Sequence, residues 1–331
     1  MTAVIDIQAL ARQIRDARGV AHKRDIDSVV ARLGLGGRHA RVPVGDDCAA
    51  IPDGDGHLLL AIEGFLDSFV AADPYFAGYC GIMVNLSDVA AMGGRPLAVV
   101  DALWSRDAAE AGPILAGLRD AATLYGVPVV GGHTNTRAAA GNLAVAVLGR
   151  AGRRLLTSFD AAPGDDLVAA IDLCGRFREP HPYWDASTGA AGERLRGDLA
   201  LLPGLAEDGL AEAAKDISMA GVVGTALMLL ECSNVGGVID LDAIPRPEHV
   251  PLARWLTAFP SFGYLLSVRP DRTPAVCARF AERSIAAASI GRLDASRVVR
   301  VCDATGAEAV VWDFVASPLI GCGQDSTGGA S

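Results

Sequence analysis

The chain has 331 residues, of which 51% are apolar, and it carries a formal net charge of −10. Its length suits two domains of roughly 150 residues each. The acidic balance argues against binding to nucleic acid or to an anionic membrane surface. The seven cysteines form no C-x-x-C pair, so neither a zinc site nor a disulfide framework is indicated. Without a signal peptide or an apolar run of about 20 residues, we expect a cytoplasmic protein.

The first half of the chain predicts alternating strands and helices. Periodic apolar residues, or runs of small residues, predict helices at residues 6–18, 24–34, 75–92 and 108–125. Apolar runs predict strands at residues 58–62, 97–104, 127–130 and 143–150. Gly126 and Pro128 mark the end of the last helix.

The second half opens at the turn Ala162-Pro163-Gly164-Asp165-Asp166. Helices are expected at residues 193–202, 205–214 and 219–232. Strands are expected at residues 167–173, 237–241, 264–268, 286–291, 297–301 and 309–314. The pattern predicts an α/β (α+β) protein with domains at residues 1–155 and 156–320, followed by a flexible Gly/Ser-rich tail at residues 321–331.

One acidic motif precedes the helix expected at residues 75–92, and a second lies within that helix. Asp46 and Asp47 follow Gly45 and precede an apolar, strand-like run. Asn85 and Asp88 lie three residues apart in a helix of small, apolar side chains that ends at Gly-Gly. An unpaired buried charge costs several kcal/mol, and oxygen-bound Mg²⁺ is a common remedy. The alternatives are a solvent-exposed turn for Asp46 and Asp47, and a helix N-cap or a polar spot on a partly exposed helix for Asp88. Asn85 would either orient Asp88 or contact a phosphate.

A glycine-rich segment follows the strand expected at residues 127–130. Gly131 and Gly132 would let backbone amides approach a ligand closely, and Thr134 offers a hydroxyl to a phosphate oxygen. The alternative is a simple loop with His133 packed against it.

Asp216 and Ser218 precede the helix expected at residues 219–232. Asp216 is a candidate for a further metal carboxylate from the second domain. The alternative is that Asp216 or Ser218 caps the helix.

The segment from Cys174 to Asp185 mixes arginine, histidine and aromatic residues. Arg176, Arg178 and Trp184 are candidates for substrate contacts in an ordered loop. A surface loop folded onto the core is an equal alternative.

In chain order, these motifs resemble the superfamily of aminoimidazole ribonucleotide synthetase, selenophosphate synthetase, thiamine-monophosphate kinase and the carbamoyl-dehydrating hydrogenase-maturation protein. The resemblance spans nearly the whole chain. Its most specific parts are Gly-Asp-Asp-x-Ala-Ala at Asp46-Asp47 and Asn-x-x-Ser-Asp-x-x-Ala-Met-Gly-Gly-x-Pro at residues 85–96. Asp216-Ile217-Ser218 strengthens the match.

The resemblance implies a homodimer whose N-terminal domains pair into a β-barrel, with ATP in a cleft against a C-terminal α+β domain. It implies ATP and Mg²⁺ as cofactors. By residue-wise transfer, the Mg²⁺ ligands would be Asp46, Asp88, Asp216 and either Asp67 or Glu63. Nucleotide contacts would come from Asp46, Asp47, Asn85, Asp88, Gly131, Gly132, His133 and Thr134. His133 and Lys23 are the catalytic candidates.

The expected function is ATP- and Mg²⁺-dependent phosphoryl transfer to a small metabolite, or activation of that metabolite. Thiamine-monophosphate kinase is one alternative, although His133 stands where those kinases usually have Asp. A selenophosphate-synthetase-like enzyme is another, although residues 10–25 lack the Cys of those enzymes. A non-catalytic nucleotide-binding subunit of a partner enzyme is the third.

Overall fold

The computed structural model describes residues 6–35 and 42–322. These residues form two compact units that interleave along the chain. The five-stranded unit comprises residues 47–155 and 187–208, and the seven-stranded unit comprises the remainder. The sequence pattern instead predicts a single division of the chain, at residue 155. Among the described residues, no helix combines the length and apolarity that a bilayer crossing requires.

The five-stranded unit is a mixed sheet with the strand order β1-β2-β5-β3-β4. Its strands are β1 (Ala49–Asp53), β2 (Gly56–Gly64), β3 (Gly94–Trp104), β4 (Val129–Asn135) and β5 (Asn142–Ala151). β3 and β4 are parallel, while the other neighbouring strands are antiparallel. The sheet is open, and the described residues of one copy form no closed barrel.

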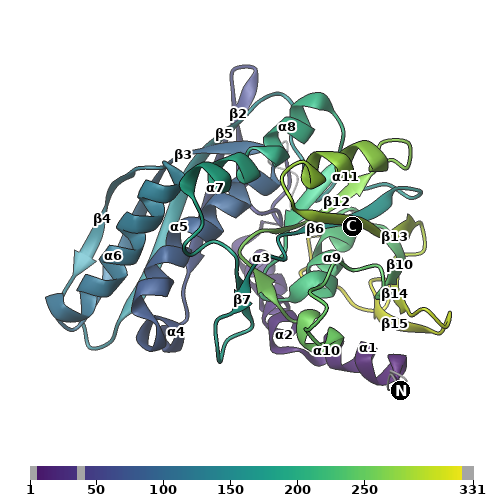
Figure 1. Ribbon diagram of the computed structural model, residues 1–331, viewed down its shortest axis with the longest axis horizontal. Helices are drawn as coiled ribbons and strands as arrows, with labels where there is room; N and C mark the ends of the chain where they lie inside the picture. Colours follow the sequence, from purple (N-terminus) through teal and green to yellow (C-terminus); the bar gives the residue numbers. More distant parts are fainter. Residues whose placement is uncertain (1–5, 36–41, 323–331) are drawn as a thin grey trace, which may run out of the picture. The chain divides into compact units, whose positions relative to one another are not determined.

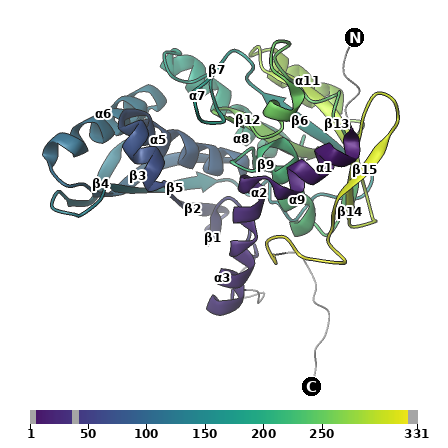
Figure 2. The same ribbon diagram turned by 90° about the horizontal axis from the view of Figure 1, so that it is seen from below.

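Helices cover one face of this sheet. They are α4 (Asp67–Ala72), α5 (Pro74–Ala91), α6 (Ala108–Tyr125), α7 (Gly192–Leu199) and α8 (Leu201–Asp208). Figure 1 shows α5 and α6 side by side, and Figure 2 shows both on the same side of the strands. The Asp107 side chain caps α6 by accepting the Glu110 N–H at 2.9 Å, and Gly126 ends the helix with a φ of +70°. The predicted helix at residues 108–125 is therefore confirmed.

Strand alternation gives the sheet a buried face and an open face. Leu59, Val99 and Val145 are fully buried toward the helices, whereas Leu60 and Ile62 are exposed on the other face. The open face therefore presents exposed apolar side chains that no other described residue covers.

The seven-stranded unit has the strand order β15-β14-β10-β13-β6-β12-β9. The strands are β6 (Asp166–Ile171), β9 (Ala213–Asp216), β10 (Gly236–Asp240), β12 (Gly263–Val268), β13 (Ala286–Asp294), β14 (Val298–Cys302) and β15 (Glu308–Asp313). The helices are α1 (Ile7–Asp16), α2 (Arg18–Lys23), α3 (Asp25–Leu33), α9 (Gly221–Cys232), α10 (Leu252–Trp255) and α11 (Thr273–Ala281). A small sheet adds β7 (Arg176–Phe177), β8 (Tyr183–Asp185) and β11 (Phe259–Pro260).

The helix predicted at residues 205–214 is wrong in its second half. α8 ends at Asp208, and Gly209 follows with a φ of +64°. Residues 213–216 form β9, a fully buried strand that pairs with β12. Burial at the sheet therefore overrides the local helical tendency of the Ala-rich segment. The predicted flexible tail lies, from residue 323 onward, outside the described residues.

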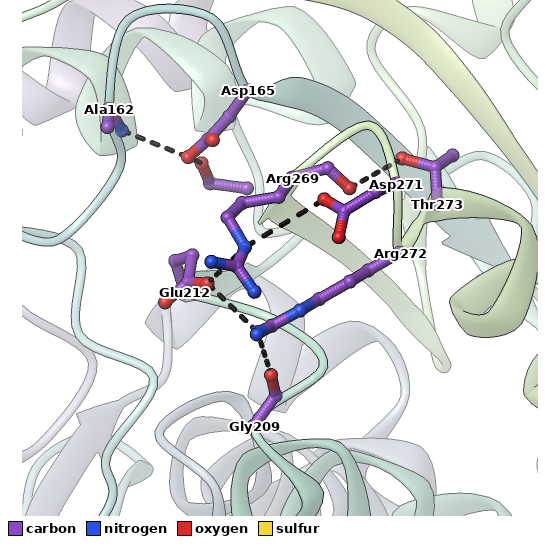
Figure 3. A network of polar contacts seen from close by, with 9 residues as sticks. Ala162, Asp165, Gly209, Glu212, Arg269, Asp271, Arg272 and Thr273 are labelled. Carbon is purple, nitrogen blue, oxygen red and sulfur yellow. Dashed lines mark hydrogen bonds and ion pairs between the residues drawn. The ribbon is translucent and has the colours of Figure 1, made fainter.

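A polar network fixes the segment that leads into β9 (Figure 3). Arg272 donates to the Gly209 carbonyl and bonds to Glu212 at 3.2 Å. Arg269 forms ion pairs with the same Glu212 and with Asp271. The turn between β12 and α11 thus holds residues 209–212 and sets the start of the strand that carries Asp216.

A buried carboxylate anchors the C-terminal segment on α9. Glu231 accepts the backbone N–H groups of Leu319 at 2.8 Å and Ile320 at 2.7 Å. In Glu231→Gln the amide NH₂ would face the Ile320 N–H, so the substitution is expected to cost about 1–3 kcal/mol of unfolding free energy. Urea unfolding checks this, with the exposed Glu282→Gln as the control, which is expected to change stability by about 0.5 kcal/mol or less. Equal stabilities of the two variants would contradict the anchoring role.

Candidate metal centre

Two carboxylates meet in the five-stranded unit. Asp88 lies in the last turn of α5 and is 5% exposed, and Asp47 is half-buried just before β1. One carboxylate oxygen of each lies within 4.8 Å of the other. Carboxylates this close repel each other unless a cation or a proton intervenes. Oxygen donors of this kind suit Mg²⁺.

The pair is brought together by the contact between the end of α5 and the start of β1. The Cys48 N–H donates to the Met92 sulfur at 3.1 Å. After α5, the chain turns at Gly93, whose φ is +75°. The next residue, Gly94, packs closely on the sheet, because a Cβ there would lie 2.3 Å from the Leu59 side chain. The Gly-Gly pair therefore serves the close return of α5 to the sheet, which sets the position of Asp88.

The side chains of the adjacent Asp46 and Asp47 lie near different residues. The Asp46 carboxylate accepts the Ser158 backbone N–H at 2.8 Å and the Ser158 hydroxyl at 2.7 Å, within the seven-stranded unit. The structure therefore places Asp47, rather than Asp46, beside Asp88. Residue spacing alone does not distinguish between two adjacent aspartates at a bend.

Asn85 is completely buried one helical turn before Asp88. Its amide nitrogen donates to the Gly81 carbonyl at 2.8 Å, while Oδ1 is buried without a hydrogen-bond partner among the described residues. A buried polar atom left unsatisfied costs about 1–3 kcal/mol. The observed hydrogen bond ties Asn85 to the preceding turn of α5, and its contact with a phosphate stays a prediction.

Glu63 and Asp67, the two alternatives for a further metal ligand, lie in different parts of the five-stranded unit. Glu63 lies near the end of β2 on the helix-covered face, as strand alternation from the buried Leu59 requires. The β1–β2 register pairs Ala49 with Leu60, so Asp47 and Glu63 lie at the same end of this hairpin. Asp67 instead begins α4 and is exposed, and it lines a cavity of about 500 Å³ with Arg106 and Glu110.

The glycine-rich segment is strand rather than loop, because β4 continues to Asn135. Gly132 pairs with Asp101 and His133 with Ala102 of β3. His133 lies on the open face, where its ring is 6.1 Å from the Trp104 ring, whereas α5 packs on the opposite face. The structure therefore does not bring His133 to Asp47 and Asp88.

In the seven-stranded unit, Asp216 is the buried last residue of β9 and pairs with Tyr264. The reading in which Asp216 or Ser218 caps α9 is wrong, since no side chain caps this helix and its N-cap residue is Ala220. Lys23 ends α2 and is half-buried.

The Cys174–Asp185 segment packs onto the core of the same unit. Trp184 is 2% exposed and donates to the Asp172 carbonyl at 3.0 Å. Arg178 pairs with the buried Asp185 at 3.4 Å, while Arg176 is exposed on β7. Trp184 is therefore part of the core, and Arg176 is the substrate candidate whose side chain is accessible.

Sequence reasoning missed Asp101, a carboxyl on β3 that lies toward α6. Burial raises its pKa above the ordinary value. The available signal was a single charge inside the apolar run Val99-Val100-Asp101-Ala102-Leu103.

Comparison with known proteins agrees with this architecture. Residues 45–151 match the N-terminal domain of AIR synthase related protein, and residues 190–303 match the C-terminal domain. An uncharacterised protein of Synechocystis sp. is 46% identical over 319 residues, covering 95% of this chain and 98% of that protein. The chain belongs to the AIR synthase-related family. The family resemblance expected from the motifs is confirmed.

Two further relatives show the range of this family. Thiamine-monophosphate kinase of Pyrococcus horikoshii is 32% identical over 227 residues, covering 62% of this chain and 69% of the kinase. The structure of T. maritima PurL complexed with ATP superposes with a TM-score of 0.71 at 21% identity, over 84% of this chain. The match covers 47% of the PurL chain, so it shows a shared fold. The mixed α/β, two-domain AIR-synthase-like fold is thus confirmed.

Proposed function

We propose that the protein binds ATP together with Mg²⁺ and transfers the terminal phosphoryl group to a small-molecule acceptor or uses it to activate that acceptor. The observation that carries the proposal is the close approach of the Asp47 and Asp88 carboxylates, one of them buried in an apolar helix. The family includes ATP-using kinases and PurL, which supports the same chemistry.

Phosphoryl transfer depends mainly on charge neutralisation and in-line positioning, so the protein needs no covalent group of its own. When bound, Mg²⁺ would neutralise charge on the phosphate oxygens. Asp47 and Asp88 would hold the ion. The apolar surroundings of α5 would strengthen the attraction by excluding water.

Further ligands are proposed on separate grounds. Glu63 is preferred to Asp67 because it shares one end of the β1–β2 hairpin with Asp47. Asp216 is proposed from its motif and its burial at the end of β9. The backbone of Gly131 and the hydroxyl of Thr134 are the candidates for phosphate contacts. Lys23 is the remaining candidate for catalysis, because His133 lies on the open face of the sheet, away from Asp47 and Asp88.

An ATP-turnover assay tests this function. The purified protein, ATP and Mg²⁺ are incubated with a panel of acceptors that begins with thiamine monophosphate, and ³¹P NMR follows the products. A phosphorylated acceptor, or ADP and phosphate formed only when an acceptor is present, is expected for wild type but not for Asp47→Asn. Binding of ATP without turnover under any condition would favour a non-catalytic nucleotide-binding subunit.

We also propose that the open face of the five-stranded sheet forms the homodimer and completes the expected barrel. Ile62 on this face is 69% exposed. Ile62→Asp is expected to convert the dimer to monomers, because it would place an unpaired charge in an apolar interface. Light scattering after size exclusion measures the mass. Val315→Asp is the matched control at the same 69% exposure outside the sheet, and a dimer that survives Ile62→Asp would exclude this face.

A further inference from the structure

A second cavity lies in the five-stranded unit, between α6 and the strands β3 and β4. Its volume is about 550 Å³, which is within the range of small-molecule sites. Leu115, Leu118 and Ala122 of α6 line it, together with the segment 126–129 and Asp101. None of the candidate metal or nucleotide residues lines this cavity, so it is a separate feature of the unit.

Asp101 gives this largely apolar cavity a carboxyl group. Its Oδ2 is buried and has no hydrogen-bond partner among the described residues. On β4, Gly132 makes room for the carboxyl, because a Cβ at Gly132 would lie 2.5 Å from Asp101 Oδ1. The same close approach accounts for a glycine that the sequence suggested for phosphate binding.

No ion pair joins the Asp101 carboxyl to a cationic side chain within residues 6–35 and 42–322. Arg119 also lines the cavity, but its guanidinium pairs with Asp120 at 2.8 Å. An acid in such surroundings is stabilised by a proton or by a cationic hydrogen-bond donor. A divalent metal ion would require about six oxygen ligands, and a single carboxylate does not supply them.

We propose that this cavity binds a small molecule that carries a protonated amine or amidine on an apolar body, with its N–H groups donating to Asp101. Leu115, Leu118 and Val127 would contact the apolar body. Burial raises the pKa of Asp101, and the positive charge of a bound cation would offset this effect and favour the carboxylate form. The inference does not depend on the proposed use of ATP.

Benzamidine and benzamide test the proposal as a matched pair, because they share a ring and differ in charge. Calorimetric titration of the full-length protein is expected to show benzamidine binding at least about tenfold more tightly than benzamide, as one charged hydrogen bond provides. Asp101→Asn should abolish this preference. Asp55→Asn, which removes an 86% exposed carboxylate with the same change in net charge, should retain it.

A cavity-filling variant guards against a folding defect in Asp101→Asn. Ala122→Leu leaves the carboxyl in place and is expected to weaken binding of benzamidine by about tenfold through steric exclusion. Equal affinity for the two probes, a preference that survives in Asp101→Asn, or no saturable binding of benzamidine up to about 10 mM would each overturn the proposal.

Discussion

Replacement of Asp88 by Asn is expected to abolish Mg²⁺-dependent ATP binding while the fold is retained. The substitution keeps the shape of the side chain but removes one of two carboxylates whose oxygens lie within 4.8 Å of each other. Even residues that only support metal ligands contribute roughly 10–100-fold to affinity, so loss of a ligand should cost about 100-fold or more. Removal of one of two like charges also relieves repulsion in the metal-free protein.

Titration calorimetry with ATP and Mg²⁺ measures the loss of nucleotide affinity, and thermal unfolding measures the change in stability of the metal-free protein. The adjacent aspartates supply the control. Asp47→Asn is expected to weaken binding as Asp88→Asn does, whereas Asp46→Asn should keep ATP binding and lose about 1–3 kcal/mol of stability through its bonds to Ser158. Unchanged nucleotide affinity in Asp88→Asn would remove this residue from the site.

Gly117→Ala is expected to be the most destabilising single-methyl addition in the five-stranded unit. A Cβ at Gly117 of α6 would lie 1.9 Å from the Tyr75 carbonyl oxygen of α5. Gly78 on α5 approaches the Ile114 carbonyl in the same way, at 2.0 Å. Since backbone atoms cannot move aside as a flexible side chain does, the substitution should force the helices apart and cost about 3 kcal/mol or more.

The same helix provides the control for this prediction. Gly112 is exposed, and a Cβ there would meet nothing within 4 Å. Gly112→Ala should therefore stabilise the protein by about 0.5–1 kcal/mol through helix propensity alone. Chemical denaturation of both variants measures the difference. A Gly117→Ala protein as stable as wild type would show that α5 and α6 do not pack this closely.

Elements with strong local signals were predictable from the sequence. α6 has an N-cap Asp, periodic apolar residues and a terminal Gly, and its predicted and observed bounds agree. β9 was not predictable, because an Ala-rich segment favours helix locally and becomes a strand only by pairing with β12. α11 was missed although Val276 and Phe280 are buried four residues apart, a spacing that signals a helix.

The candidate site was predictable as a set of residue types but not as a geometry. The buried Asp88 was identifiable as a carboxylate in an apolar helix. The choice between Asp46 and Asp47 depends on how a bend directs two neighbouring side chains, which residue spacing does not encode. His133 lies on the open face because of β-strand alternation, once β4 is known to extend to Asn135.

The central claim is that Asp47 and Asp88 hold a divalent cation with ATP. Calorimetric titration of the wild-type protein with a non-hydrolysable ATP analogue, with Mg²⁺ and then with EDTA, tests it most directly. Micromolar binding with Mg²⁺ that EDTA abolishes is the predicted result. Absence of binding in both conditions, or equal affinity in both, would contradict the claim.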